Sequence, residues 1–164
     1  THFSASDETF AVIADAGFRQ SSISNPGRVV PKYHARWDGA LPGPHFAHPA
    51  DRLAEGSLPL LEIPVTTDPM QRRDGIAPEL RIENGTVSEW HAPLVRAQLE
   101  RQFTSGERWP TLVFVTTTRQ PFYDRTSRVR QTAEGLADLL ESLEADYDLV
   151  PATPSRLHAT VASA

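Results

Sequence analysis

Apolar positions recur at helical spacing in four stretches of the chain. In the first, Phe10, Ile13 and Ala14 share one face of a helix expected over 7–16, and Gly17 stands where a left-handed C-terminal cap belongs. The clearest stripe comes later, where leucines recur three and four positions apart. Together the periodic stretches predict helices over residues 7–16, 93–103, 129–143 and 154–161.

Shorter apolar and β-branched runs predict strands. Residues 60–66 form a run that looks buried, with Pro64 at a bulge or an edge. Residues 111–117 are rich in Val and Thr, which is typical of an interior strand. Weaker patterns add strands at 18–24 and 147–150.

Two further runs, 80–82 and 86–88, flank the segment Glu83–Gly85, which contains Asn-Gly. This combination predicts a β-hairpin. Because strands and helices alternate through the second half of the chain, the pattern as a whole favours an α/β fold with a parallel sheet or barrel.

Residues 25–58 lose all periodicity, because prolines and glycines interrupt every run. The same stretch carries aromatic and branched residues that favour burial, among them Val29, Tyr33 and Trp37. We therefore expect a long, ordered, irregular loop that covers another part of the fold, rather than a disordered segment.

Composition narrows the possible classes of protein. The 164 residues correspond to about one domain, which is large enough to form a hydrophobic core without disulfide bonds or a structural metal. A net charge of −5 argues against nucleic-acid binding, and no apolar run is long enough to predict a membrane span. The absence of cysteine excludes a disulfide scaffold, a zinc ribbon and a cysteine nucleophile.

Two segments carry a resemblance to a known family. The first runs from His2 to Phe10 and on through Ala16-Gly17-Phe18 to Ser21-Ser22, and the second is Leu61-Glu62-Ile63-Pro64-Val65. In order and spacing they resemble the middle of the polysaccharide deacetylase family, which are metal-dependent carbohydrate esterases of the NodB-homology type. The resemblance implies a hydrolase that removes an acyl group from a carbohydrate, at a carbon–nitrogen bond where the group is an amide.

The resemblance also carries expectations about architecture. Residues 1–164 would form a single domain comprising the later βα units of a distorted (β/α)7 barrel, with the long loop and the hairpin inserted. The chain would be the C-terminal part of a larger barrel and would need a missing N-terminal segment or a companion chain. A bacterial cytoplasmic or periplasmic protein would suit the family.

The sequence departs from the family at its reacting core. The family's Asp-Asp pair and H-x-x-x-H pattern, which hold a divalent metal such as zinc, do not occur here and are expected before Thr1. No metal ligand is therefore expected in this chain. The family's general-acid histidine is also missing, and Thr116 or Thr117 stands roughly where that histidine would be, while His2 falls near the family's backbone oxyanion donor. A catalytically silent carbohydrate-binding or structural homologue is the alternative.

Four loop residues are candidates for contact with a sugar, because aromatic and hydrogen-bonding side chains together suit carbohydrate: Trp37, Asp38, His45 and His48. For Trp37, packing in the core is an equal alternative. The H-x-x-H spacing of His45 and His48 also suits zinc on a helix, but Pro44 and Pro49 bracket the pair and disfavour a helix there.

Two further expectations concern single residues. Glu62 lies in a buried-looking strand and needs a partner, for which Arg81 is the favoured residue. Thr1 raises a remote alternative, an N-terminal-threonine hydrolase in which the α-amine activates the hydroxyl. That class needs a strand after the nucleophile, whereas residues 4–8 resemble the start of a helix.

Overall fold

The computed structural model describes residues 3–71, 74 and 76–164. It has a mixed α/β architecture, with four α-helices and two small sheets among the described residues. The helices are α1 (Thr9–Asp15), α2 (Ala92–Thr104), α3 (Arg128–Leu143) and α4 (Pro154–Ala162), at the places that the apolar periodicity predicts.

Local signals explain where these helices begin and end. After α1, Gly17 takes a φ of +91°, and the Phe18 N–H reaches the Ile13 carbonyl at 3.2 Å, which closes the helix. Helix α4 begins as its sequence predicts, because the Thr153 hydroxyl accepts from the Arg156 N–H and Pro154 occupies the first turn.

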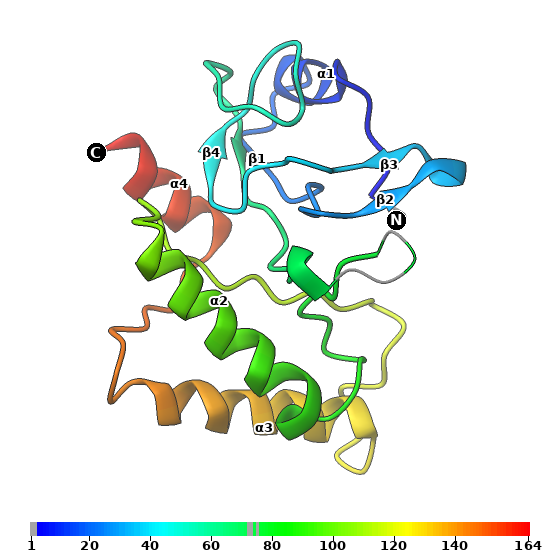
Figure 1. The fold of residues 1–164 in the computed structure, drawn as a ribbon, viewed down its shortest axis with the longest axis vertical. Coiled ribbons are helices and arrows are strands. Elements are labelled where there is room, and N and C mark those ends of the chain that lie inside the picture. Colours follow the sequence, from blue (N-terminus) through cyan, green and yellow to red (C-terminus); the bar gives the residue numbers. More distant parts are fainter. Residues whose placement is uncertain (1–2, 72–73, 75) are drawn as a thin grey trace.

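The larger sheet has three strands in the order β1 (Gln20–Ser21), β5 (Leu61–Glu62) and β4 (His45–Phe46). Strand β5 runs parallel to β1 and antiparallel to β4. A two-stranded antiparallel ribbon, β2 (Val29–Val30) and β3 (Ala35–Arg36), lies beside it (Figure 1). The expected long loop is therefore ordered and contributes strands β2, β3 and β4.

The predicted hairpin over 80–88 is wrong. The turn forms, with Gly85 at a φ of +59°, but the Thr86 side chain then accepts from the Glu89 N–H. This cap starts a π-helical turn, Val87–His91, that leads directly into α2. The residues expected to form the second strand are therefore the beginning of a helix.

Two predicted strands are not formed as regular elements. In 111–117, Val115 makes one parallel bridge with Arg81, and the Val113 N–H donates to the Thr66 hydroxyl at 2.7 Å. The segment is extended, but one of its backbone N–H groups bonds a side chain instead of the backbone of a neighbouring strand. Residues 147–150 carry no strand, because the Tyr147 N–H still bonds the Leu143 carbonyl as the chain leaves α3.

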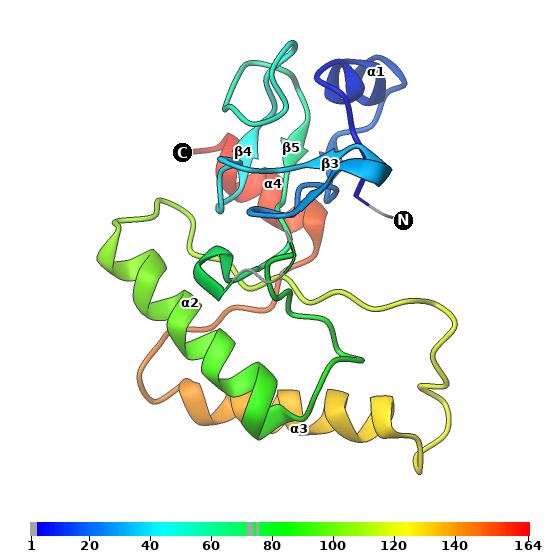
Figure 2. The same ribbon diagram turned by 45° about the vertical axis from the view of Figure 1, so that its right-hand side comes forward.

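Apolar side chains gather in two separate clusters. One lies around the sheets and α1 and includes Phe10, Trp37 and Leu60, all fully buried. The other lies between α2 and α3 and includes Val95 and Leu143. Figures 1 and 2 show the sheets with α1 and α4 in one half of the molecule and the crossed helices α2 and α3 in the other.

The fold is thus α/β, with a parallel β1–β5 pair. Closure of such units into a distorted barrel stays a prediction. No helix within the described ranges is both long and apolar enough to cross a membrane.

Candidate functional site

A groove of about 210 Å³ opens beside β4 and combines carboxylate, imidazole and aromatic side chains. We call it the polar groove. Its walls come from four parts of the chain: the segment that leads into and includes β4, the segment after β4, the loop that follows α2, and the last turn of α4. Its lining includes Gly43, His45, Glu55, Glu107, Trp109 and Val161.

His45 anchors the β4 wall of the polar groove. Its side chain is buried, and Nδ1 lies 2.8 Å from the Gly43 carbonyl, so Nδ1 carries the proton and donates it. Burial lowers the pKa of His45, although the Gly43 bond and the charges of Glu55 and Glu107 oppose the shift. The ring is therefore neutral at physiological pH and fixes the backbone turn at Gly43.

Glu107 and Trp109 form the opposite wall. The Glu107 carboxyl group packs so closely on Gly43 that a Cβ added at Gly43 would lie 2.5 Å from the carboxyl carbon. The half-buried Trp109 ring carries the Arg108 guanidinium at 5.4 Å from its centroid. Carboxylates that accept hydrogen bonds thus stand beside an amphipathic aromatic ring, an arrangement suited to a hydroxyl-rich ligand.

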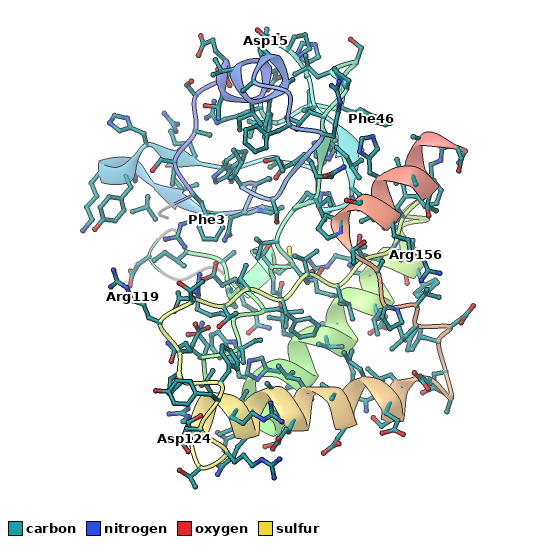
Figure 3. The ribbon with its side chains drawn as sticks, turned by 180° about the vertical axis from the view of Figure 1, so that it is seen from behind. Phe3, Asp15, Phe46, Arg119, Asp124 and Arg156 are labelled. Carbon is teal, nitrogen blue, oxygen red and sulfur yellow. The ribbon has the colours of Figure 1, made fainter. Side chains whose placement is uncertain are left out.

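Helix α4 closes the groove through contacts with the sheet. His158 Nδ1 lies 2.8 Å from Gln20 Nε2, and the His158 ring packs edge-on against Phe46 at a centroid distance of 5.7 Å. Figure 3 shows Phe46 beside this helix. These contacts hold Val161, one turn further along α4, against the groove.

A row of polar residues crosses the three-stranded sheet next to the groove. Ser21, Glu62 and His45 are paired in register on β1, β5 and β4, so their side chains lie on one face. Glu62 Oε2 and His45 Nε2 are each buried without a hydrogen-bond partner among the described residues. The row therefore holds unused hydrogen-bonding capacity.

The expected pairing of Glu62 with Arg81 is wrong. Glu62 Oε1 accepts from the backbone N–H groups of Ile23 and Ser24, at 2.9 and 2.7 Å. Arg81 instead donates to Glu79 at 2.6 Å. Burial raises the pKa of Glu62, and the polar groups around the carboxyl only moderate the rise. The protonated form of Glu62 is thus favoured by the fold.

The structure separates the four candidate sugar contacts. His45 lies in the polar groove, whereas Trp37 is fully buried in the core and donates from Nε1 to the Phe3 carbonyl at 2.6 Å. Core packing, the alternative stated for Trp37, is therefore what the structure shows. Asp38 is exposed, and His48 Nδ1 accepts from the Ala50 N–H at 3.1 Å, outside the described groove lining.

The two residues singled out by position lie elsewhere. Thr116 is exposed and donates to Glu83 Oε1 at 3.0 Å, a carboxylate that the Thr117 N–H also binds at 2.8 Å. Despite partial burial, these bonds lower the pKa of Glu83. His2 lies outside the described residues. Glu107 and Trp109 escaped sequence reasoning, since they follow α2 without a motif.

The resemblance implies a divalent metal, and the donor set can be tested against it. Within residues 3–71, 74 and 76–164, no three His, Cys, Asp or Glu side chains come together as metal ligands. The described donor set does not fit a divalent metal, and no chemical step through a metal is assigned to it.

Comparison with known proteins adds no family assignment. No protein-family model, curated protein or solved structure matches this chain.

Proposed function

We propose that this chain is the carbohydrate-binding part of a polysaccharide-deacetylase-like hydrolase, and that the polar groove holds the sugar. One observation carries the proposal: Glu107, Trp109 and Glu55 line one groove next to β4. The order of the sequence motifs supports the same family, as does the parallel pairing of Gln20 and Ser21 with Leu61 and Glu62.

Each groove residue has a distinct part in this proposal. Glu107 and Glu55 accept hydrogen bonds from sugar hydroxyls, and the Trp109 ring contacts the apolar face of the sugar. His45 is a positioning residue, because it holds the Gly43 turn against which Glu107 packs.

Hydrolysis of the acyl group is assigned to the intact protein, with the divalent metal and the base carried by residues other than those described. A catalytically silent carbohydrate-binding homologue is the second candidate. One observation favours it: Thr116, near the family's histidine position, is engaged with Glu83.

The binding proposal is tested by titrating the chain with an N-acetylated chito-oligosaccharide in a calorimeter. We expect saturable binding that Trp109→Ala weakens by roughly tenfold, a loss of about 1.4 kcal/mol. Glu107→Gln should also weaken it. His48→Ala is the control, since His48 lies in the same loop as His45 but outside the groove lining. This variant should bind the oligosaccharide as the unaltered chain does. Absence of binding, or equal binding by all variants, contradicts the proposal.

The enzymatic part is tested by an activity assay. Release of acetate from the same oligosaccharide, abolished by a chelator and restored by a divalent metal, supports the hydrolase. Binding without acetate release supports the silent homologue.

A further inference from the structure

Strands β4 and β5 place His45 and Glu62 directly opposite each other (Figure 2). Paired residues of antiparallel strands point to the same face of the sheet, with Cβ atoms about 4.5–5.5 Å apart. Phe46, the next residue of β4, points to the other face, where it packs against His158 of α4. His45 and Glu62 are both buried, so they are close neighbours in an environment with little solvent.

Each of these two side chains has one atom engaged and one atom free. His45 Nδ1 donates to the Gly43 carbonyl at 2.8 Å, and Glu62 Oε1 accepts from two backbone N–H groups. The remaining atoms, His45 Nε2 and Glu62 Oε2, are buried without a hydrogen-bond partner among the described residues. Because an unpaired polar atom is costly inside a protein, a bond between these two atoms would remove both costs.

The protonation states make the two free atoms complementary. With its proton on Nδ1, the neutral His45 ring presents a lone pair at Nε2 and can only accept there. Burial raises the pKa of Glu62, which favours a carboxylic acid with a proton to donate. A neutral acid beside a neutral imidazole therefore supplies a donor and an acceptor without burying a charge.

Other polar groups near the pair do not supply this donor. The Ser21 hydroxyl faces Glu62 from β1, but β5 lies between β1 and β4, so Ser21 is not adjacent to His45. The charged groups that act on His45 are Glu55 and Glu107, and their carboxylates accept hydrogen bonds, as Nε2 itself does. Glu62 is thus the donor that the sheet register brings to His45.

We propose that Glu62 is a positioning residue of the polar groove: as a neutral acid it donates from Oε2 to His45 Nε2, which keeps the His45 proton on Nδ1, where it holds the Gly43 turn. Glu107 packs against this turn, so Glu62 acts on the groove through His45 and Gly43. The inference rests on the proposed function, because it adds a control of the geometry of the sugar groove.

Ionisation of Glu62 should reverse this arrangement. Glu62 then releases its proton to solvent, and the carboxylate at Oε2 can only accept. The His45 proton is expected to move from Nδ1 to Nε2, with no change in the charge of the ring. Nδ1 then faces the Gly43 carbonyl as a second acceptor, and the turn loses its hydrogen bond. Sugar binding should weaken as the pH rises through the folded pKa of Glu62.

The first test determines the His45 tautomer by NMR, because a ring nitrogen has different chemical shifts with and without a proton. In the unaltered chain the proton should lie on Nδ1 at pH 5 and on Nε2 at pH 8. Glu62→Gln, whose amide donates at either pH, should keep it on Nδ1. Glu83→Gln, the same change at a carboxyl outside the groove lining, should behave as the unaltered chain does. A proton that stays on Nδ1 in the unaltered chain, or that moves in Glu62→Gln as well, overturns the proposal.

The second test needs no variant, so it decides the question even if Glu62→Gln does not fold. The carboxyl carbon of Glu62 and the ring nitrogens of His45 are followed through one pH titration of the unaltered chain. Their signals should change with a common midpoint, because a single ionisation causes both changes. Separate midpoints overturn the proposal.

The effect on the polar groove is measured by calorimetry with the N-acetylated chito-oligosaccharide. The affinity of the unaltered chain relative to that of Glu62→Gln should fall by about three- to tenfold from pH 5 to pH 8, the effect of one lost hydrogen bond. Glu55 and Glu107 are present in both proteins, so the ratio isolates the contribution of Glu62. A ratio that does not change with pH contradicts the action of Glu62 on the groove.

The two proposals fail in different ways. A change of the His45 tautomer without oligosaccharide binding supports the contact between Glu62 and His45 and refutes carbohydrate binding at the polar groove. Oligosaccharide binding with a His45 tautomer that does not change with pH refutes only the role of Glu62.

Discussion

His45 and Glu62 are direct partners across the antiparallel strands β4 and β5, so two buried titratable side chains are neighbours on one sheet face. Burial shifts their pKa values in opposite directions: it raises the pKa of Glu62 and lowers the pKa of His45. Both shifts favour the neutral forms. Stability should therefore depend on pH at both residues, with opposite signs.

Glu62→Gln should flatten the loss of stability at high pH. The folded pKa of Glu62 lies above its ordinary value of 4.5. Its stabilising contribution is thus complete below pH 4.5 and is lost as the pH rises through the folded pKa. Gln keeps an acceptor for the Ile23 and Ser24 N–H groups. Urea unfolding at pH 5 and pH 8 checks this, and parallel pH profiles for the two proteins would refute it.

The contribution of His45 has the opposite sign. Its folded pKa lies below 6.5, so its stabilising effect is complete above pH 6.5 and is lost as the pH falls through the folded value. His45→Gln should therefore reduce the loss of stability between pH 7 and pH 4. A urea series at these pH values measures the difference, and an unaltered slope would contradict it.

Gly56→Ala should destabilise the protein by roughly 1–3 kcal/mol, because overpacking in a tight contact forces the backbone to move. An added Cβ would lie 2.4 Å from the His48 Cα, which belongs to the backbone of the paired segment. Thermal unfolding monitored by circular dichroism gives the change. Ser57→Ala, at an exposed neighbour, serves as the control and should change stability little.

Gly43→Ala should act on binding more than on stability. The clash at Gly43 is with the Glu107 carboxyl group, the far end of a flexible side chain that can rotate away. We expect a loss of oligosaccharide affinity similar to that of Glu107→Gln. In a double-mutant cycle the combined variant should lose no more than either alone. Additive losses would show that Gly43 and Glu107 act independently.

Substitutions of Trp37 and Trp109 should have opposite effects on stability and on sugar binding. Trp37→Phe should lower stability by about 1–3 kcal/mol, through the lost bond to Phe3 and lost volume, and leave oligosaccharide binding intact. Trp109→Ala should weaken binding with little effect on stability. Unfolding and calorimetry on both variants test this prediction. Reduced sugar affinity in Trp37→Phe would contradict it and would indicate that Trp37 takes part in sugar binding.

The helices could be predicted because their signals are local. Thr153 and Pro154 start α4, and Gly17 ends α1, each through atoms within a few residues. Strands β1 and β5 lie within the predicted strands 18–24 and 60–66, but each has only two residues, and their pairing of Gln20 with Leu61 depends on partners distant in the sequence. Strands β2, β3 and β4, inside the expected loop, could not be predicted. At 84–88 two local signals compete: the turn forms at Gly85, but the cap at Thr86 makes the next residues helical.

The site was only partly predictable for the same reason. His45 belongs to a loop rich in candidate residues, and the structure places it in the groove. Its counterparts, Glu107 and Trp109, are more than 60 positions away in a loop without a motif, and the packing of Glu107 on Gly43 joins the two walls. Glu62 was correctly expected to be buried. Its partners could not be predicted, because they are the backbone N–H groups of Ile23 and Ser24, which any residue type provides.

The two hydrophobic clusters give the polar groove a thermodynamic role. His45 belongs to the half built around the sheets, whereas Glu107 and Trp109 belong to the loop after α2. The polar groove is therefore a seam between the two halves. A ligand in this seam contacts both halves, so its binding energy opposes their separation, and an occupied protein should unfold in a single, more cooperative transition.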